Sequence, residues 1–135
     1  SLGKYKNSFA LISYKIISEH PAIEGKVASA IVKIRVNGAT KIAAADGEGP
    51  VHAMDLALRA ALSDFYPEIA RMSLVDFKVR VLDSDKATAA KVRVLITSAD
   101  SADSWTTVGV SEDVIEASWI ALTDSIDYAL MRRER

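Results

Sequence analysis

An internal repeat is the feature that most constrains the fold of this chain of 135 residues. Two segments carry apolar side chains at helical spacing on one face. Ile115 in the second segment corresponds to Val51 in the first. The matching positions are Val51, Ala53, Ala57, Leu58 and Leu62 in the first segment and Ile115, Ala117, Ala121, Leu122 and Ile126 in the second. Strand-like segments precede each helix in the same order, so the sequence predicts two βββα units.

The strands of the first unit are predicted at residues 9–19, 27–36 and 40–45, which are rich in β-branched residues and largely alternate in polarity. His20-Pro21 is expected to end the first strand. Asn37-Gly38 predicts a tight hairpin between the next two.

The first helix is predicted to begin at Pro50 and to end before Pro67, with Phe65 on its apolar face. Proline suits the first helical position because the N–H that it lacks has no partner there anyway.

The second unit is predicted to have strands at residues 72–82, 90–98 and 106–110 and a helix over residues 112–131. Ser111 is expected to cap this helix, with Glu112 and Asp113 near the positive end of its dipole.

These elements predict an α+β fold of two βββα units related by a pseudo-twofold axis, with the helices segregated against antiparallel sheets. We expect one domain over residues 9–131, with repeats at about residues 9–67 and 72–131. Residues 1–8 are expected to be a lead-in or a linker remnant.

Composition excludes several classes of site. There is no cysteine, and the two histidines, His20 and His52, lack metal-ligand spacing, so neither a disulfide nor a metal site is expected. His52 and Asp55 are expected to form a surface pair. No apolar run approaches the roughly 20 residues needed to span a bilayer, and no signal peptide opens the chain, so we expect a cytoplasmic protein without membrane contact.

Basic side chains alternate with apolar ones along several predicted strands. They are Lys33, Arg35, Lys78, Arg80, Lys91 and Arg93. A sheet that presents them could bind RNA, but the strands lack aromatic residues for stacking and the net charge is −1. A solvated face, or one that faces another domain, is therefore favoured over a nucleic-acid partner.

The turn Gly47-Glu48-Gly49-Pro50 leads into the first helix. A pseudo-twofold axis would bring residues 48–51 and 111–114 together, and the backbone N–H groups of two helix starts would suit a carboxylate. The alternative is structural, since glycine is common in turns for its dihedral angles. Phosphate is not expected, because neither a P-loop lysine nor a third glycine follows.

Two longer segments, DFKVRVLDSDKATAAKVRVLIT and WTTVGVSEDVIEASWIAL, together with GEGPVHAMDLALRAAL, resemble the C-terminal regulatory domain of citramalate synthases and alpha-isopropylmalate synthases. The resemblance covers residues 9–130 and is closer to the citramalate branch. It implies two βββα units that form a homodimer and bind the end-product amino acid as a feedback inhibitor. Citramalate synthases respond to isoleucine and isopropylmalate synthases to leucine.

The same resemblance implies a separate catalytic barrel, which condenses acetyl-CoA with a 2-keto acid and uses a divalent metal. That barrel is missing here, so no catalytic residue and no cofactor are expected in this fragment. Isoleucine is the expected effector and leucine the second choice. A dimerisation domain without a ligand is the remaining alternative.

Matching motifs place the implied effector pocket at both helix starts and on the fourth strand. It consists of Gly47, Glu48, Gly49, Pro50, Val51, Leu74, Phe77, Val81, Thr88, Ala90, Glu112, Val114 and Ile115. Leu74, Phe77 and Val81 would line the slot for the aliphatic side chain. Family members often carry Tyr at position 77 and a shorter Asn or Asp at position 48, so two polar contacts differ in this chain.

Overall fold

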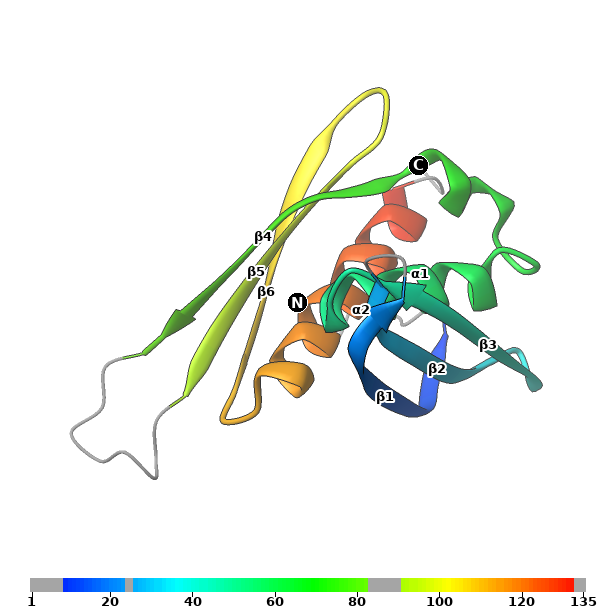
Figure 1. The fold of residues 1–135 in the computed structure, drawn as a ribbon. Coiled ribbons are helices and arrows are strands. Elements are labelled where there is room, and N and C mark those ends of the chain that lie inside the picture. The colour runs from blue at the N-terminus through cyan, green and yellow to red at the C-terminus, as the bar shows by residue number, and fades with distance from the viewer. Residues whose placement is uncertain (1–8, 24–25, 83–90, 133–135) are drawn as a thin grey trace. The chain divides into compact units, whose positions relative to one another are not determined.

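The computed structural model describes residues 9–23, 26–82 and 91–132. The chain divides into two compact units. One contains the residues up to Ile69 together with the end of the last helix from Ala129, and the other contains Ala70 to Tyr128. Each unit carries one antiparallel sheet of three strands followed by a helix (Figure 1). The predicted α+β class with two βββα units is confirmed, and the pseudo-twofold axis stays a prediction.

The sheet of the first unit has the order β1 (Ala10–Ile23), β2 (Lys26–Val36) and β3 (Ala39–Gly47). The helix α1 (Pro50–Leu62) lies on β2 and β3 and hardly reaches β1. Small side chains allow this close approach, because Ala30 of β2 and Ala57 of α1 are both fully buried. The core of this unit is therefore built on alanines as well as on larger aliphatic residues.

The hairpin predicted at Asn37-Gly38 is confirmed. Both residues have positive φ angles, 49° and 85°, and Val36 pairs directly with Ala39 across the two-residue turn. Positive φ at both central positions is the requirement of a type I′ turn, which asparagine followed by glycine meets best.

Two predicted boundaries in this unit are wrong. The strand β1 continues past His20-Pro21 to Ile23. It is an edge strand, where proline is tolerated because one row of backbone N–H groups has no neighbour to bond. The helix α1 begins at Pro50 as predicted but ends at Leu62, so Phe65 lies beyond its last turn.

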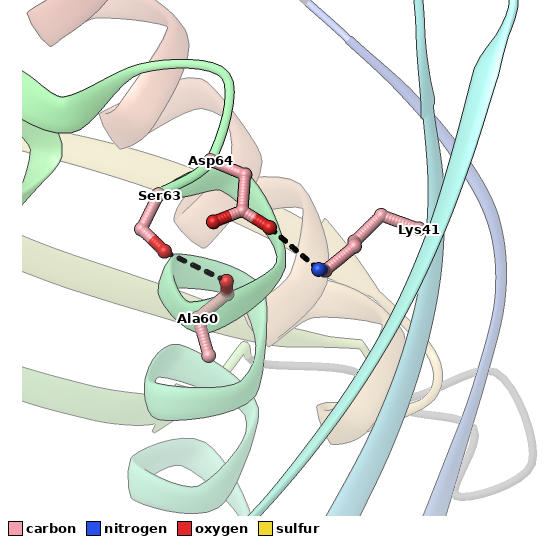
Figure 2. Close-up of polar contacts among 4 residues, drawn as sticks. All are labelled: Lys41, Ala60, Ser63 and Asp64. Carbon is pink, nitrogen blue, oxygen red and sulfur yellow. Dashed lines mark hydrogen bonds and ion pairs between the residues drawn. The ribbon is translucent and has the colours of Figure 1, made fainter.

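Two side-chain contacts lie at the end of α1. The Ser63 hydroxyl donates to the carbonyl of Ala60 at 2.9 Å, and Lys41 of β3 pairs with Asp64 at 2.5 Å (Figure 2). The ion pair links the residues just after α1 to β3. A short 3₁₀ helix, η1 (Pro67–Arg71), then leads to the second unit.

The sheet of the second unit has the order β4 (Ser73–Val81), β5 (Val92–Ala99) and β6 (Ser104–Ser111). The helix α2 (Val114–Arg132) follows. Hydroxyl groups join it to the sheet: Thr107 of β6 donates to the carbonyl of Ala121 at 2.7 Å, and Ser98 of β5 bonds Ser125 at 2.6 Å.

The strand β6 is longer than predicted and includes Trp105, which is buried. Its indole N–H lies 3.1 Å from both oxygens of Ser125, and its ring packs against Tyr128 with 5.7 Å between centroids. The last turns of α2 within this unit are therefore held by an indole and hydroxyl network.

The basic residues of the second sheet share the face away from α2. Arg80 pairs with Arg93 in register, while the neighbouring pair of Val79 and Val94 faces the helix, where Val94 is buried. Within the part of the chain that the structure describes, neither helix is both long and apolar enough to cross a membrane.

Candidate functional site

The turn between β3 and α1 contains two glycines with different structural roles. A Cβ atom on Gly47 would lie 2.5 Å from the backbone nitrogen of Ala53, so only glycine lets the strand end pass this close to the helix. Gly49 has an extended backbone, with φ −164°, and nothing lies within 4 Å of the position of its Cβ. The structural reading of the turn therefore accounts for Gly47 and leaves Gly49 without a steric reason.

The start of α1 carries no side-chain cap. Gly49 is the residue before the first turn, and its carbonyl accepts the N–H of Ala53 at 3.0 Å. It has no side chain for the N–H groups of Val51 and His52, and the first turn holds no acidic residue. Two backbone donors at the positive end of a helix are thus available to an anion.

His52 closes the turn from the other side. The backbone N–H of Glu48 donates to Nδ1 of His52 at 3.1 Å. This bond holds the glutamate backbone next to the helix start and leaves the carboxylate of Glu48 exposed.

The predicted surface pair of His52 and Asp55 is wrong. Asp55 is buried and forms an ion pair with Arg59, with 3.1 Å between Oδ2 and the guanidinium. Burial raises the pKa of Asp55, and the charge and hydrogen bond of Arg59 offset part of that rise.

The start of α2 is capped by its own side chains. Asp113, not the predicted Ser111, is the cap: its Oδ1 accepts the N–H of Ile115 at 2.9 Å. Ser111 accepts the N–H of Asp113 at 3.1 Å and donates to Glu116 at 2.5 Å. The negative charge that this helix start favours is already supplied by the chain.

The strand β4 places the predicted slot residues on one face. Phe77 pairs with Ile96 and Val81 with Val92, on the side of the sheet that faces α2. Leu74 and Phe77 are three residues apart and would point to opposite faces in a regular strand. A bulge between Leu74 and Asp76 restores Leu74 to the common face, where it pairs with Ser98.

These residues lie on an edge strand outside the cover of α2. Phe77 is 45% exposed and Val81 is 69% exposed. A phenylalanine this exposed does not simply fill the core of the unit. Each retains apolar surface that can contact an aliphatic group.

Comparison with known proteins identifies the family. The profile of the family described as LeuA allosteric (dimerisation) domain matches residues 1–130. The chain belongs to the LeuA allosteric (dimerisation) domain family. The resemblance found in the sequence is thereby confirmed.

Several relatives of this chain are named as synthases. The (R)-citramalate synthase of Geobacter sulfurreducens is 42% identical over 135 residues, which is 99% of this chain and 26% of the relative. That of Aquifex aeolicus is 46% identical over 133 residues, 98% of this chain and 25% of the relative. A 2-isopropylmalate synthase of Aquifex aeolicus is 29% identical over 111 residues, 82% of this chain and 20% of the relative. The chain spans about a quarter of the length of the citramalate synthases that it matches.

The predicted effector residues of this chain fall into groups within each unit. Residues 47–51 form the turn and first helical residues of α1. Leu74, Phe77 and Val81 share one face of β4, and Glu112, Val114 and Ile115 surround the start of α2. Thr88 and Ala90 lie outside the described residues. The meeting of these groups in one pocket stays a prediction.

Sequence reasoning missed two residues that shape these helix starts. His52 lies three positions after Gly49, which is where a capping-box side chain reaches back. Asp113 directly precedes the apolar helical pattern, the usual place of a cap. Among the residues that the structure describes, no group of three or more histidine, aspartate or glutamate side chains could hold a metal ion.

Proposed function

We propose that this chain is the regulatory domain of a citramalate synthase and that it binds isoleucine as a feedback inhibitor. The observation that carries the proposal is the uncapped start of α1, which offers the N–H groups of Val51 and His52 in a family described as allosteric. A free amino acid supplies the carboxylate that such a start favours.

The remaining groups of the amino acid need partners of other kinds. The ammonium group requires an acceptor, for which the exposed carboxylate of Glu48 is our candidate. The aliphatic side chain requires apolar surface, for which Leu74, Phe77 and Val81 on β4 are the candidates. Phenylalanine at position 77 offers no hydroxyl, so the contact there is apolar.

Isoleucine is preferred over leucine because the citramalate synthase relatives are 42% and 46% identical, against 29% for the 2-isopropylmalate synthase. The two amino acids differ in the position of one methyl group, which an apolar pocket distinguishes by about 1–3 kcal/mol. Leucine therefore stays the second candidate. In the parent protein, acetyl-CoA, the 2-keto acid and a divalent metal would belong to the catalytic part.

Binding would regulate by favouring one arrangement of the parent protein over another. Such allostery requires different affinities for two states, typically a coupling of about 1–3 kcal/mol. We propose a homodimer as the assembly within which this coupling acts, in agreement with the description of the family as a dimerisation domain.

Calorimetric titration with isoleucine, leucine and valine tests the proposal. Isoleucine should bind most tightly, and isoleucinol, which lacks the carboxylate, should bind far more weakly. Phe77→Ala should weaken binding while the fold is kept. Heat from none of the three amino acids would reject the regulatory function and leave a dimerisation domain, which sedimentation equilibrium would detect.

A further inference from the structure

The contact between Glu48 and His52 resembles half a capping box that is displaced by one residue. In that motif the third helical residue reaches back to the N–H of the cap residue, and the cap residue reaches forward. Here Nδ1 of His52 accepts the N–H of Glu48 at 3.1 Å, while Gly49 has no side chain that could accept a backbone N–H of the first turn. The turn is therefore held by His52, and the N–H groups at the start of α1 have no side-chain acceptor.

This bond requires a neutral imidazole. Nδ1 accepts a hydrogen bond only without a proton of its own, so the ring proton lies on Nε2. In the imidazolium form both nitrogens are donors, and Nδ1 would face the Glu48 N–H with a second N–H. The new positive charge would also lie at the positive end of α1.

The charged groups around His52 do not all favour a positively charged ring. Asp55 on α1 attracts a positive ring, but it is already paired with Arg59 at 3.1 Å. The carboxylate of Glu48 is exposed and therefore screened.

Among the side chains that the structure describes on β2 and β3, the charged ones are either paired or lie on the side of the sheet away from α1. On the side of β3 that faces α1 the charged residue is Lys41, which is paired with Asp64. On β2, Lys33 and Arg35 alternate with buried residues that face α1 and so lie on the other side of the sheet.

We propose that His52 is a positioning residue whose neutral ring holds the turn at Glu48 and Gly49 in the conformation that leaves the start of α1 open to the effector carboxylate. Protonation of His52 would release the turn and weaken effector binding. The part that concerns the effector rests on the proposed function, whereas the effect on the turn does not.

Two substitutions separate the hydrogen bond from the titration. In His52→Asn the amide oxygen occupies the place of Nδ1, accepts from the Glu48 N–H and does not titrate. In His52→Leu the side chain has similar bulk and no acceptor. The asparagine variant should therefore keep the turn at every pH, and the leucine variant should lose it at every pH.

Hydrogen exchange of the Glu48 amide tests the turn without a ligand. After correction for intrinsic exchange, the unaltered chain should protect this amide wherever the ring resonances of His52 report a neutral imidazole and lose the protection wherever they report a charged one. His52→Asn should protect it under both conditions and His52→Leu under neither. Equal protection in the two ring states of the unaltered chain would overturn the proposal.

Calorimetry with isoleucine under the same two conditions, one for each state of the ring, tests the consequence. The dissociation constant should rise by about fivefold when the ring is charged, the change that corresponds to one neutral hydrogen bond. His52→Asn should bind equally under both. A pH dependence that persists in His52→Asn, or tighter binding in acid, would overturn the role of His52. Absence of binding under either condition would instead reject the proposed function and leave the exchange result to decide the turn.

Discussion

The helices α1 and α2 follow sheets of the same strand order, yet their first turns are satisfied in different ways. At α2, Asp113 accepts a backbone N–H at 2.9 Å and Glu116 adds a charge to the first turn. At α1, Gly49 provides no side chain and the first turn holds no acid. One residue before each helix thus decides whether a side chain of the protein satisfies the first turn or leaves its backbone N–H groups open.

The two helix–sheet interfaces also differ in chemistry. In the first unit, buried alanines such as Ala30 and Ala57 let the helix and sheet approach. In the second, Ser98, Thr107 and Trp105 bond α2 directly. The repeated plan needs an apolar helix face and a matching sheet face, and it does not require the same side chains.

The largest effect should come from the matched leucines of the two helix faces. Leu58 and Leu122 occupy equivalent positions and are almost completely buried. Each change to alanine should cost about 2–5 kcal/mol of the free energy of unfolding, measured by urea denaturation, because a cavity remains. Phe77→Ala, at a side chain 45% exposed, should cost less than either. A cost below that of Phe77→Ala at one leucine would show that the two faces do not play equivalent roles.

The glycines of the first unit give the next effect. Gly47→Ala places a methyl group 2.5 Å from the backbone of Ala53 and should cost about 1–3 kcal/mol through overpacking. Gly49→Ala meets nothing within 4 Å, and its cost should stay near the roughly 0.5 kcal/mol that separates these residues at a helix cap. Thermal unfolding of both variants measures the difference. Equal losses would contradict the distinction between the two glycines.

Removal of the cap at α2 and addition of a cap at α1 test the comparison directly. Asp113→Ala removes a cap and should cost about 1 kcal/mol of stability without weakening isoleucine binding at α1. Gly49→Ser adds a hydroxyl beside the free N–H groups, which should stabilise α1 slightly and weaken isoleucine binding. Urea denaturation and calorimetry measure the two quantities. Unchanged binding in Gly49→Ser would place the carboxylate elsewhere.

Local sequence patterns predicted the features that depend on neighbours along the chain. Asn37-Gly38 specified its turn, and Pro50 specified the start of α1. The strand β1 passed Pro21 because it lies at a sheet edge, and edge position is set by the whole sheet. The end of α1 at Leu62, well before Pro67, is not indicated by the periodicity of apolar residues, which continues to Phe65.

The candidate residues were assigned from the sequence, and their meeting in one site stays a prediction. The turn at residues 47–51 and the cluster on β4 were assigned by their motifs, and the bulge that aligns Leu74 with Phe77 lay outside what alternation could indicate. His52 and Asp55 were assigned to each other by spacing alone. In the structure, Asp55 is buried and pairs with Arg59, and His52 accepts the backbone N–H of Glu48.

The smallest expected effect is a pH dependence of stability at one buried position that the two helices share in the repeat. Asp55 of α1, paired with Arg59, corresponds to Trp119 of α2, followed by Thr123, which donates to the Trp119 carbonyl at 2.9 Å. Only the first unit therefore has a carboxyl group that can titrate at this position. Because the pKa of Asp55 is raised from 3.8 in the folded chain, the native state holds this proton more tightly than the unfolded state. Its contribution to stability is complete below pH 3.8 and is lost as the pH rises through the raised pKa.

Asp55→Asn should remove that loss. The free energy of unfolding of the unaltered chain, relative to the asparagine variant, should fall between pH 3.5 and pH 7 in urea denaturation. Asp64→Asn, at a largely exposed carboxylate, is the matched control and should show little change, because exposed pairs contribute about 0–1 kcal/mol. A relative stability that rises with pH would mean that the attraction of Arg59 outweighs the burial of Asp55. The ion pair would then stabilise α1 at a position where α2 uses an indole.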